Sequence, residues 1–261
     1  MKLLALETTG PFASVAYWED GLEAPVQKTA PGEFSHLQST LPLAQELLQE
    51  RGVSFDQITH VACSRGPGSF TGIRIGMTAA RTLGQVWNVP VIAVPTLESF
   101  AYKAPVGRTA CPVLDARRQQ VYGGAYCRTQ DGVETLVPEG AYDLTDYLAA
   151  VEAACEQKAV ARETLLFYGD GLRPYGEAVA RWLGTGESRL VPEGERYQEA
   201  AAVARLAKTL IEQGRETSWQ EAQPVYLRKA EAERKLPETK QETLEQAADV
   251  FTAGAANRGI K

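Results

Sequence analysis

Hydrophobic and polar positions alternate along the first part of the chain with the periods of strands. The apolar run Lys2–Glu7 is typical of a buried strand, and Phe12–Trp18 alternates as a second strand. Asp20-Gly21 predicts a two-residue hairpin, from which residues 22–28 return as a third strand. A helical pattern follows and runs to residue 50. Pro42 lies within it, so this helix either begins near residue 41 or continues through the proline with a kink.

A glycine-rich loop separates a short β-rich run from a long helical pattern. The strand covers residues 58–63 and the helix residues 71–87. A compact strand at 91–94 and a short helix at 96–102 follow. The order of strands and helices is typical of an α/β fold with a mixed sheet.

The second half of the chain loosely repeats the first. Two similar α/β halves suggest the actin-like, sugar-kinase and Hsp70 (ASKHA) architecture. We expect an N-terminal lobe at 1–104, a C-terminal lobe at 105–228 and a charged, partly helical tail at 229–261. The predicted strands are 112–115, 120–127, 132–137 and 164–168, and the predicted helices are 144–155, 175–183 and 197–213.

Composition is that of an ordinary globular protein, with 44% hydrophobic and 23% charged residues. The net charge of −6 argues against direct, non-specific nucleic-acid binding, which requires Lys and Arg to neutralise phosphates. The N-terminus turns acidic too soon for a signal peptide, and no apolar run approaches the ~20 residues of a membrane span. The four cysteines show no Cys-x-x-Cys spacing. We therefore expect reduced thiols and a cytoplasmic location.

The glycine-rich loop directs backbone N–H groups toward the start of a helix. Gly66, Gly68 and Gly72 surround Ser69 and Thr71, either of which could cap that helix. Such a junction suits an anion such as a phosphate. A capped turn that needs its glycines only for positive φ explains the pattern equally well. The spacing matches neither a Walker A loop nor a dinucleotide-binding fingerprint.

Several longer strings resemble a single family. Residues 65–76, Arg-Gly-Pro-Gly-Ser-Phe-Thr-Gly-Ile-Arg-Ile-Gly, are similar to the signature of the bacterial TsaB family. That family also opens with a segment like residues 3–9. It shares a His-x-x-x-x-Leu-Pro segment (36–42), an Asp-Ala-Arg then Val-Tyr segment (115–122) and Pro-Val-Tyr-Leu-Arg (224–228). The matches follow the family's order and span most of the chain, and they imply the ASKHA fold.

The resemblance implies a non-catalytic partner subunit of the tRNA threonylcarbamoyl transferase complex. That complex modifies adenosine at position 37 of tRNAs that read codons beginning with A. The implied partners are a catalytic TsaD-type subunit and a TsaE-type ATPase, with tRNA contacted only through the complex and no membrane. No cofactor of its own is expected, and ATP or ADP at the subunit interface and a homodimer of the isolated chain stay open.

Two residues separate this chain from the catalytic sister family, TsaD. There, two histidines four residues apart bind the metal, and Thr96 and Phe100 stand at those positions here. Phe cannot bind a metal and Thr is a poor ligand, so we predict no metal site and no catalytic residue. The two histidines, His36 and His60, show no triad pattern. The alternatives, a metalloprotease-like protein or a small-molecule kinase of the ASKHA superfamily, need ligands or a catalytic acid that the sequence does not show.

Acidic residues occur where ASKHA proteins that act on phosphates place theirs, on the first strand of each half. Glu7 and Asp115 stand there and could contact a nucleotide. Alternatively, Glu7 caps the first turn and Asp115 pairs with Arg117 or Arg118. The candidate nucleotide or phosphate contacts are Glu7, Gly66, Gly68, Ser69, Thr71, Gly72 and Asp115.

The helix at 71–87 carries more apolar surface than one sheet face needs. Its polar residues occupy an arc of roughly 100° and the others an arc of roughly 200°. Small residues recur every four positions from Gly72 to Gly84, which lets another helix approach closely. We expect this helix and the preceding one to form a four-helix interface with a related subunit; the alternative buries the whole arc inside the chain. The predicted interface residues are Leu37, Leu41, Ala44, Leu48, Ile73, Gly76, Met77, Ala80 and Gly84.

Overall fold

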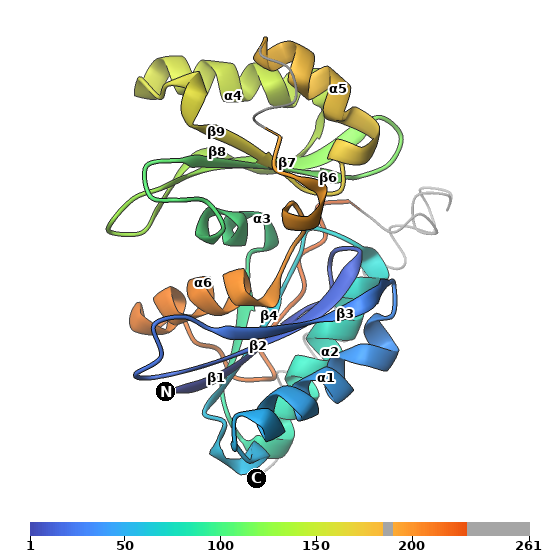
Figure 1. The fold of residues 1–261 in the computed structure, drawn as a ribbon, viewed down its shortest axis with the longest axis vertical. Helices are drawn as coiled ribbons and strands as arrows, with labels where there is room; N and C mark the ends of the chain where they lie inside the picture. The colour runs from blue at the N-terminus through green and yellow to red at the C-terminus, as the bar shows by residue number, and fades with distance from the viewer. Residues whose placement is uncertain (185–189, 229–261) are drawn as a thin grey trace, which may run out of the picture. The chain divides into compact units, whose positions relative to one another are not determined.

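The computed structural model describes residues 1–184 and 190–228, which contain two mixed sheets with helices packed on them (Figure 1). The predicted tail at 229–261 lies outside the described residues. The first sheet has the strand order β3-β2-β1-β4-β5, in which β2 and β3 are antiparallel to their neighbours and β4 and β5 run parallel to β1. Its strands are β1 (Lys2–Glu7), β2 (Phe12–Glu19), β3 (Val26–Glu33), β4 (His60–Ser64) and β5 (Val91–Val94).

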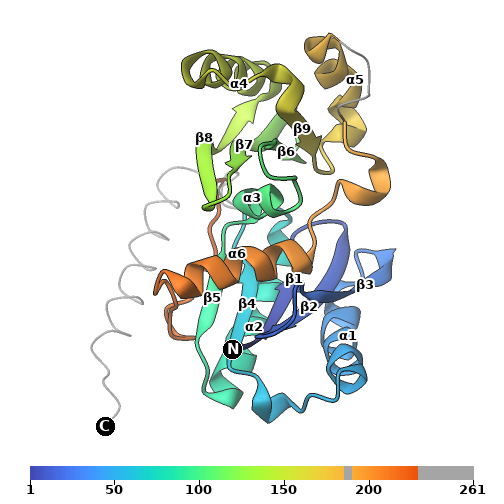
Figure 2. The same ribbon diagram turned by 60° about the vertical axis from the view of Figure 1, so that its left-hand side comes forward.

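Helices cover both faces of the first sheet, which is why β1 is an unbroken apolar run. Helices α1 (His36–Glu50) and α2 (Phe70–Trp87) pack on one face, and α6 (Ala200–Glu212) packs on the other (Figures 1 and 2). Because Ala200 and Leu206 share a core with Leu3 on β1, α6 belongs to the first lobe. The expected division, with a C-terminal lobe at 105–228, is therefore wrong after about residue 197, where the chain returns to the first sheet.

The second sheet has the order β8-β7-β6-β9. Helices α4 and α5 share one core with it, and the short helices α3 and η2 share another. The strands are β6 (Thr109–Asp115), β7 (Gln120–Arg128), β8 (Val133–Asp143) and β9 (Leu165–Tyr168). The helices are α3 (Thr96–Ser99), α4 (Leu144–Lys158) and α5 (Leu172–Leu183), with 3₁₀ turns η1 (Phe55–Gln57), η2 (Phe100–Tyr102), η3 (Arg162–Thr164) and η5 (Glu193–Glu195).

Two local predictions in the first lobe need comment. The two-residue hairpin at Asp20-Gly21 is wrong: β3 begins only at Val26, and Tyr17 pairs with Val26 across a longer loop. Pro42 lies inside α1, which begins at His36 and continues through the proline. The missing N–H of Pro42 is tolerated there because packing of α1 on the sheet fixes the helix independently of one hydrogen bond.

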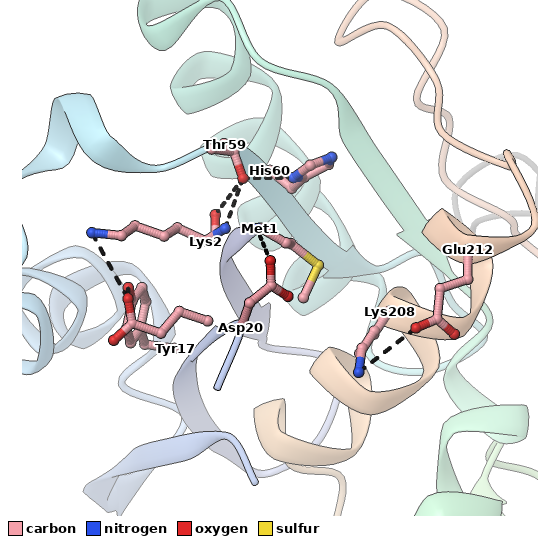
Figure 3. A network of polar contacts seen from close by, with 9 residues as sticks. Met1, Lys2, Tyr17, Asp20, Thr59, His60, Lys208 and Glu212 are labelled. Carbon is pink, nitrogen blue, oxygen red and sulfur yellow. Dashed lines mark hydrogen bonds and ion pairs between the residues drawn. The ribbon is translucent and has the colours of Figure 1, made fainter. Parts of the chain in front are cut away.

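Polar contacts hold the N-terminus against the start of β4 (Figure 3). The backbone N–H of Lys2 donates to Thr59 Oγ1 (2.8 Å), and that oxygen lies 2.7 Å from His60 Nδ1. The ammonium group of Met1 pairs with Asp20. His60 thus begins β4, whereas the glycine-rich loop follows the other end of this strand. Its ring is part of a structural network and not of a site at the loop.

Candidate functional sites

The glycine-rich loop leads from β4 into α2, and Ser69 caps the helix. Ser69 Oγ accepts a hydrogen bond from the N–H of Gly72 (3.2 Å), so the cap prediction is confirmed for Ser69. It is wrong for Thr71, which lies within the first turn of α2 with its side chain exposed.

The glycines of this loop allow the chain to approach itself closely. Gly66 has φ +106°, and a Cβ there would overlap the carbonyl oxygen of Val225. A Cβ at Gly72 would overlap the carbonyl oxygen of Thr8. The N–H of Gly66 donates to Thr96 Oγ1 (3.1 Å), and that of Ser69 donates to the carbonyl of Thr9 (2.9 Å). Several N–H groups that could receive a phosphate are therefore already hydrogen-bonded, as the capped-turn alternative predicts.

A cavity of about 300 Å³ lies beside this loop and is lined by residues from both lobes. Three predicted contacts, Gly68, Ser69 and Asp115, line it, whereas Glu7, Gly66, Thr71 and Gly72 do not. Five polar residues of the lining were not among the predicted contacts: Thr9, Arg117, Tyr122, Asp170 and Gln198. The Gly-Asp-Gly string after the predicted strand at 164–168 could have indicated Asp170, because loops at strand ends often form sites. No sequence signal marks Gln198.

The carboxylate of Asp115 is held within its own loop. Its Oδ1 accepts from the N–H of Arg117 (2.8 Å), and Oδ2 lies 3.3 Å from the Arg117 guanidinium. The N–H of Asp115 donates to Asp170 Oδ1 (3.3 Å). Burial, and then the neighbouring charge of Asp115, raise the pKa of Asp170. The predicted pairing of Asp115 with Arg117 is confirmed, and nucleotide binding in this cavity stays a prediction.

Glu7 lies beneath the loop and is fully buried. Its Oε1 accepts hydrogen bonds from the N–H and the hydroxyl of Thr9, and its Oε2 accepts from the hydroxyl of Ser64. Burial raises the pKa of this carboxyl, against the opposing effect of these hydrogen bonds. Glu7 as a nucleotide contact is therefore wrong, and the alternative, a cap on the first turn, is confirmed.

Thr96 and Phe100 are both buried and engaged within the chain. Thr96 ties α3 to the loop through Gly66, and the Phe100 ring packs 5.6 Å from that of Tyr168. Within residues 1–184 and 190–228, no three His, Cys, Asp or Glu side chains are placed to hold a metal ion. Thr96 and Phe100 therefore stabilise the fold, one through a hydrogen bond and the other through ring packing.

The predicted interface residues lie mostly inside the chain. Only Leu37 (78% exposed) and Leu41 (49%) face outward. The other seven, Ala44, Leu48, Ile73, Gly76, Met77, Ala80 and Gly84, are buried, which corrects their assignment. The row of small residues lets α2 approach its own sheet and C-terminal segment: a Cβ at Gly76 would overlap Thr8, and one at Gly84 would overlap Val91.

A different face of the same two helices is open. A groove of about 420 Å³ runs between α1 and α2, and its lining is predominantly apolar. Leu37 and Leu41 line it from α1, and Ile75, Ala79 and Leu83 line it from α2. The sequence analysis placed the last three on the broad apolar arc, but periodicity could not show which part of that arc the sheet would cover. We call this feature the α1–α2 groove.

Comparisons with known proteins agree with this architecture. A model of the TsaD family, tRNA N6-adenosine threonylcarbamoyltransferase, matches residues 33–236. The chain is 32% identical over 241 residues to the TsaB protein of Escherichia coli, named for tRNA threonylcarbamoyladenosine biosynthesis, covering 91% of this chain and 99% of that one. The Haemophilus influenzae TsaB protein is 28% identical, with coverage of 91% and 98%. The solved YeaZ structure from Pseudomonas aeruginosa superposes with a TM-score of 0.68 at 27% identity, covering 87% of this chain and 99% of that one.

Two lobes, each with a mixed sheet, and a cavity lined from both define a protein of the actin-like ASKHA class. No helix of the described ranges is long and apolar enough to cross a membrane. The family match and the full-length relatives narrow the assignment further. The chain belongs to the TsaB family.

Proposed function

We propose that this chain is the non-catalytic partner subunit of a tRNA threonylcarbamoyl transferase complex. Thr96 and Phe100 carry the proposal, because they occupy the positions of the metal-binding histidines of TsaD-type enzymes. Both side chains are buried and used for packing or hydrogen bonding. A chain that keeps the fold without these ligands fits a supporting role beside a TsaD-type subunit, with a TsaE-type ATPase joining them.

The α1–α2 groove is the surface we assign to the TsaD-type subunit. An exposed apolar face on two packed helices is costly in water unless another protein covers it. The match to the TsaD family model supports a partner of the same fold, with an equivalent helix pair. The side chains of each helix pair can then pack into the groove of the other pair, as in other helix–helix contacts. The four-helix arrangement is retained with a different set of residues.

The catalytic part of the proposal is tested by reconstitution. The purified chain is incubated with tRNA, threonylcarbamoyl-adenylate and a divalent metal, alone or with TsaD- and TsaE-type proteins from the same cells. We expect modified adenosine only when the TsaD-type subunit is present. Modified adenosine formed by this chain alone would overturn the non-catalytic role.

The docking part is tested with charges placed in the groove. Leu37→Arg and Ile75→Arg should weaken association with the TsaD-type subunit by at least about 100-fold, because each buries an unpaired charge at the centre of the contact. Val106→Arg is the matched control, since Val106 is 54% exposed and does not line the groove. Sedimentation measures association, and thermal melting checks that every variant is folded. Equal binding by all three variants would show that the partner docks elsewhere.

A further inference from the structure

A cavity of about 600 Å³ lies where α6, η2 and β9 meet. It shares no lining residue with the α1–α2 groove or with the cavity beside the glycine-rich loop. Ala201 and Arg205 line it from α6, and Leu166 and Tyr168 line it from β9. Apolar and aromatic side chains surround several charged residues in this lining. Neither the proposed function nor the predicted nucleotide contacts use this cavity.

Two of the charged residues neutralise each other. Lys103 Nζ lies 2.8 Å from a carboxylate oxygen of Glu199, and the Lys103 side chain is only 8% exposed. Lys103 follows η2, which packs with the second sheet, and Glu199 directly precedes α6, which packs on the first. The pair therefore connects the two lobes, and it adds no net charge to the cavity.

One charge of each sign is left uncompensated. Within residues 1–184 and 190–228, neither Arg205 nor Glu195 forms an ion pair, with each other or with another residue. The guanidinium carbon of Arg205 lies 5.9 Å from the centre of the Trp18 ring, a contact that supplies no full negative charge. A molecule in the cavity can therefore gain one ion pair through a cationic group and one through an anionic group.

The cavity also contains a buried hydroxyl group without a partner. Tyr168 is only 4% exposed, and its ring packs 5.6 Å from that of Phe100. Its hydroxyl forms no hydrogen bond with any described residue, yet its oxygen remains accessible from the cavity. Burial, and then the charges of Glu199 and Glu195, raise the pKa of Tyr168 to about 12, so the hydroxyl is protonated at pH 7. Because an unpaired buried hydroxyl is costly, a polar group of a ligand is expected beside it.

The two uncompensated charges are separated along α6. Glu195 and Glu199 both lie close enough to Tyr168 to affect its pKa, so this group marks the negative end of the cavity, near the start of α6. Arg205 follows Glu199 by six residues, which corresponds to about 9 Å along a helix. Because helical side chains lean toward the N-terminus of their helix, the distance between the charges is at most about this value.

We propose that this cavity binds a short peptide of two or three residues with both termini free. Its ammonium group pairs with Glu195 and donates to the Tyr168 hydroxyl oxygen, and its terminal carboxylate pairs with Arg205. Two or three extended residues span roughly 7–10 Å, which matches the separation of the charges. A single α-amino acid carries both charges beside one carbon and cannot reach both ends. A simple anion would meet Glu195 and Glu199, and a simple cation would meet Arg205, so neither fits as well.

Calorimetry on the full chain tests the proposal with three tripeptides, Ala-Gly-Ala, Ala-Leu-Ala and Ala-Phe-Ala. We expect binding of at least one of them, and weaker binding of free alanine. Glu195→Gln and Arg205→Gln should each weaken peptide binding about tenfold, because each removes a charge-assisted hydrogen bond. Tyr168→Phe should weaken it about fivefold. Lys208→Gln is the matched control: Lys208 lies on α6 beside Trp18 but does not line the cavity, and its variant should stay within about twofold of wild type.

Blocked peptides show which end of the ligand each residue binds. Acetylation of the N-terminus should weaken binding to the wild-type chain but should cause little further loss in Glu195→Gln. Amidation of the C-terminus should behave in the same way with Arg205→Gln. Thermal melting checks that each variant is folded. If none of the three tripeptides binds, or if the blocked peptides bind as tightly as the free ones, the proposal is wrong.

Discussion

The glycine-rich loop and the α1–α2 groove both adjoin helix α2, but they differ in how they relate to the rest of the chain. The loop forms its contacts within the chain, whereas the groove is exposed to solvent. In the loop, the N–H of Ser69 donates to Thr9 and that of Gly72 donates to Ser69, so the chain satisfies itself. In the groove, by contrast, large apolar side chains stay uncovered: Leu37 is 78% exposed and Leu41 is 49% exposed.

This difference shows which kind of evidence indicates a binding site in this molecule. A strand, a glycine-rich loop and a helix form a recognisable pattern, but close approach of Thr8 and Val225 already explains Gly72 and Gly66. The groove has no recognisable motif in the sequence. Its signal is energetic: an apolar surface is left exposed to water.

The inner and outer faces of α2 can be separated by one charge on each. Ala80 is fully buried against the first sheet, so Ala80→Arg places an uncompensated charge in the core. We expect a loss of at least about 4 kcal/mol of unfolding free energy, a large part of the stability of a typical domain. Thr78→Arg, on the exposed side of the same helix, should change stability by about 0.5 kcal/mol or less. Chemical denaturation measures both, and a folded Ala80→Arg would return Ala80 to the interface.

Sequence patterns predicted the elements of this fold well where local chemistry decides them. The strand at Lys2–Glu7 has the predicted bounds, and α2 starts one residue before the predicted position because Ser69 caps it. The hairpin at Asp20-Gly21 failed because pairing of β2 with β3 depends on register, which a turn dipeptide alone does not fix.

The sites were harder to predict because they depend on which surfaces the fold covers. The small-residue row on α2 indicated a close approach correctly but did not say to what, and the answer is the chain's own Thr8 and Val91. The return of α6 to the first sheet is a long-range contact, as is the placement of Gln198 in the cavity. Neither leaves a periodic or spaced signal in the sequence.

A single methyl group at Gly72 should destabilise the glycine-rich loop, whose N–H groups are hydrogen-bonded within the chain. Gly72→Ala places a Cβ against the carbonyl oxygen of Thr8, and a backbone atom cannot turn away as a side chain can. We expect a loss of about 3 kcal/mol, at the upper end of ordinary overpacking. Gly32→Ala is the control, because nothing lies within 4 Å of its Cβ position, and it should change stability by about 0.5 kcal/mol or less. Urea denaturation compares the two; equal effects would mean that the loop has room to move.

The smallest expected effect concerns pH, and it distinguishes the buried groups of the two regions by sign. Burial lowers the pKa of His36, so the unfolded chain binds more protons below its ordinary value of about 6.5, and stability is lost as pH falls. Burial raises the pKa of Glu7, so its contribution is present at low pH and is lost as pH rises above about 4.5 toward the folded-state value. Between about pH 5 and pH 7 the two effects oppose each other.

Because the effects oppose each other, the useful quantity is the difference between wild type and a variant at each pH, and not the wild-type curve. His36→Leu removes a group whose protonation favours unfolding, so its stability relative to wild type should rise as pH is lowered from about 7 to about 5. His60→Gln is measured for comparison, because burial lowers the pKa of His60 as well, with Glu216 opposing, and its stability relative to wild type should change in the same direction. Denaturant titrations of the free chain at each pH provide these differences. If the His36→Leu difference is flat, the pKa of His36 is the same in the folded and the unfolded chain, and the backbone of Gly10 then offsets the effect of burial in full.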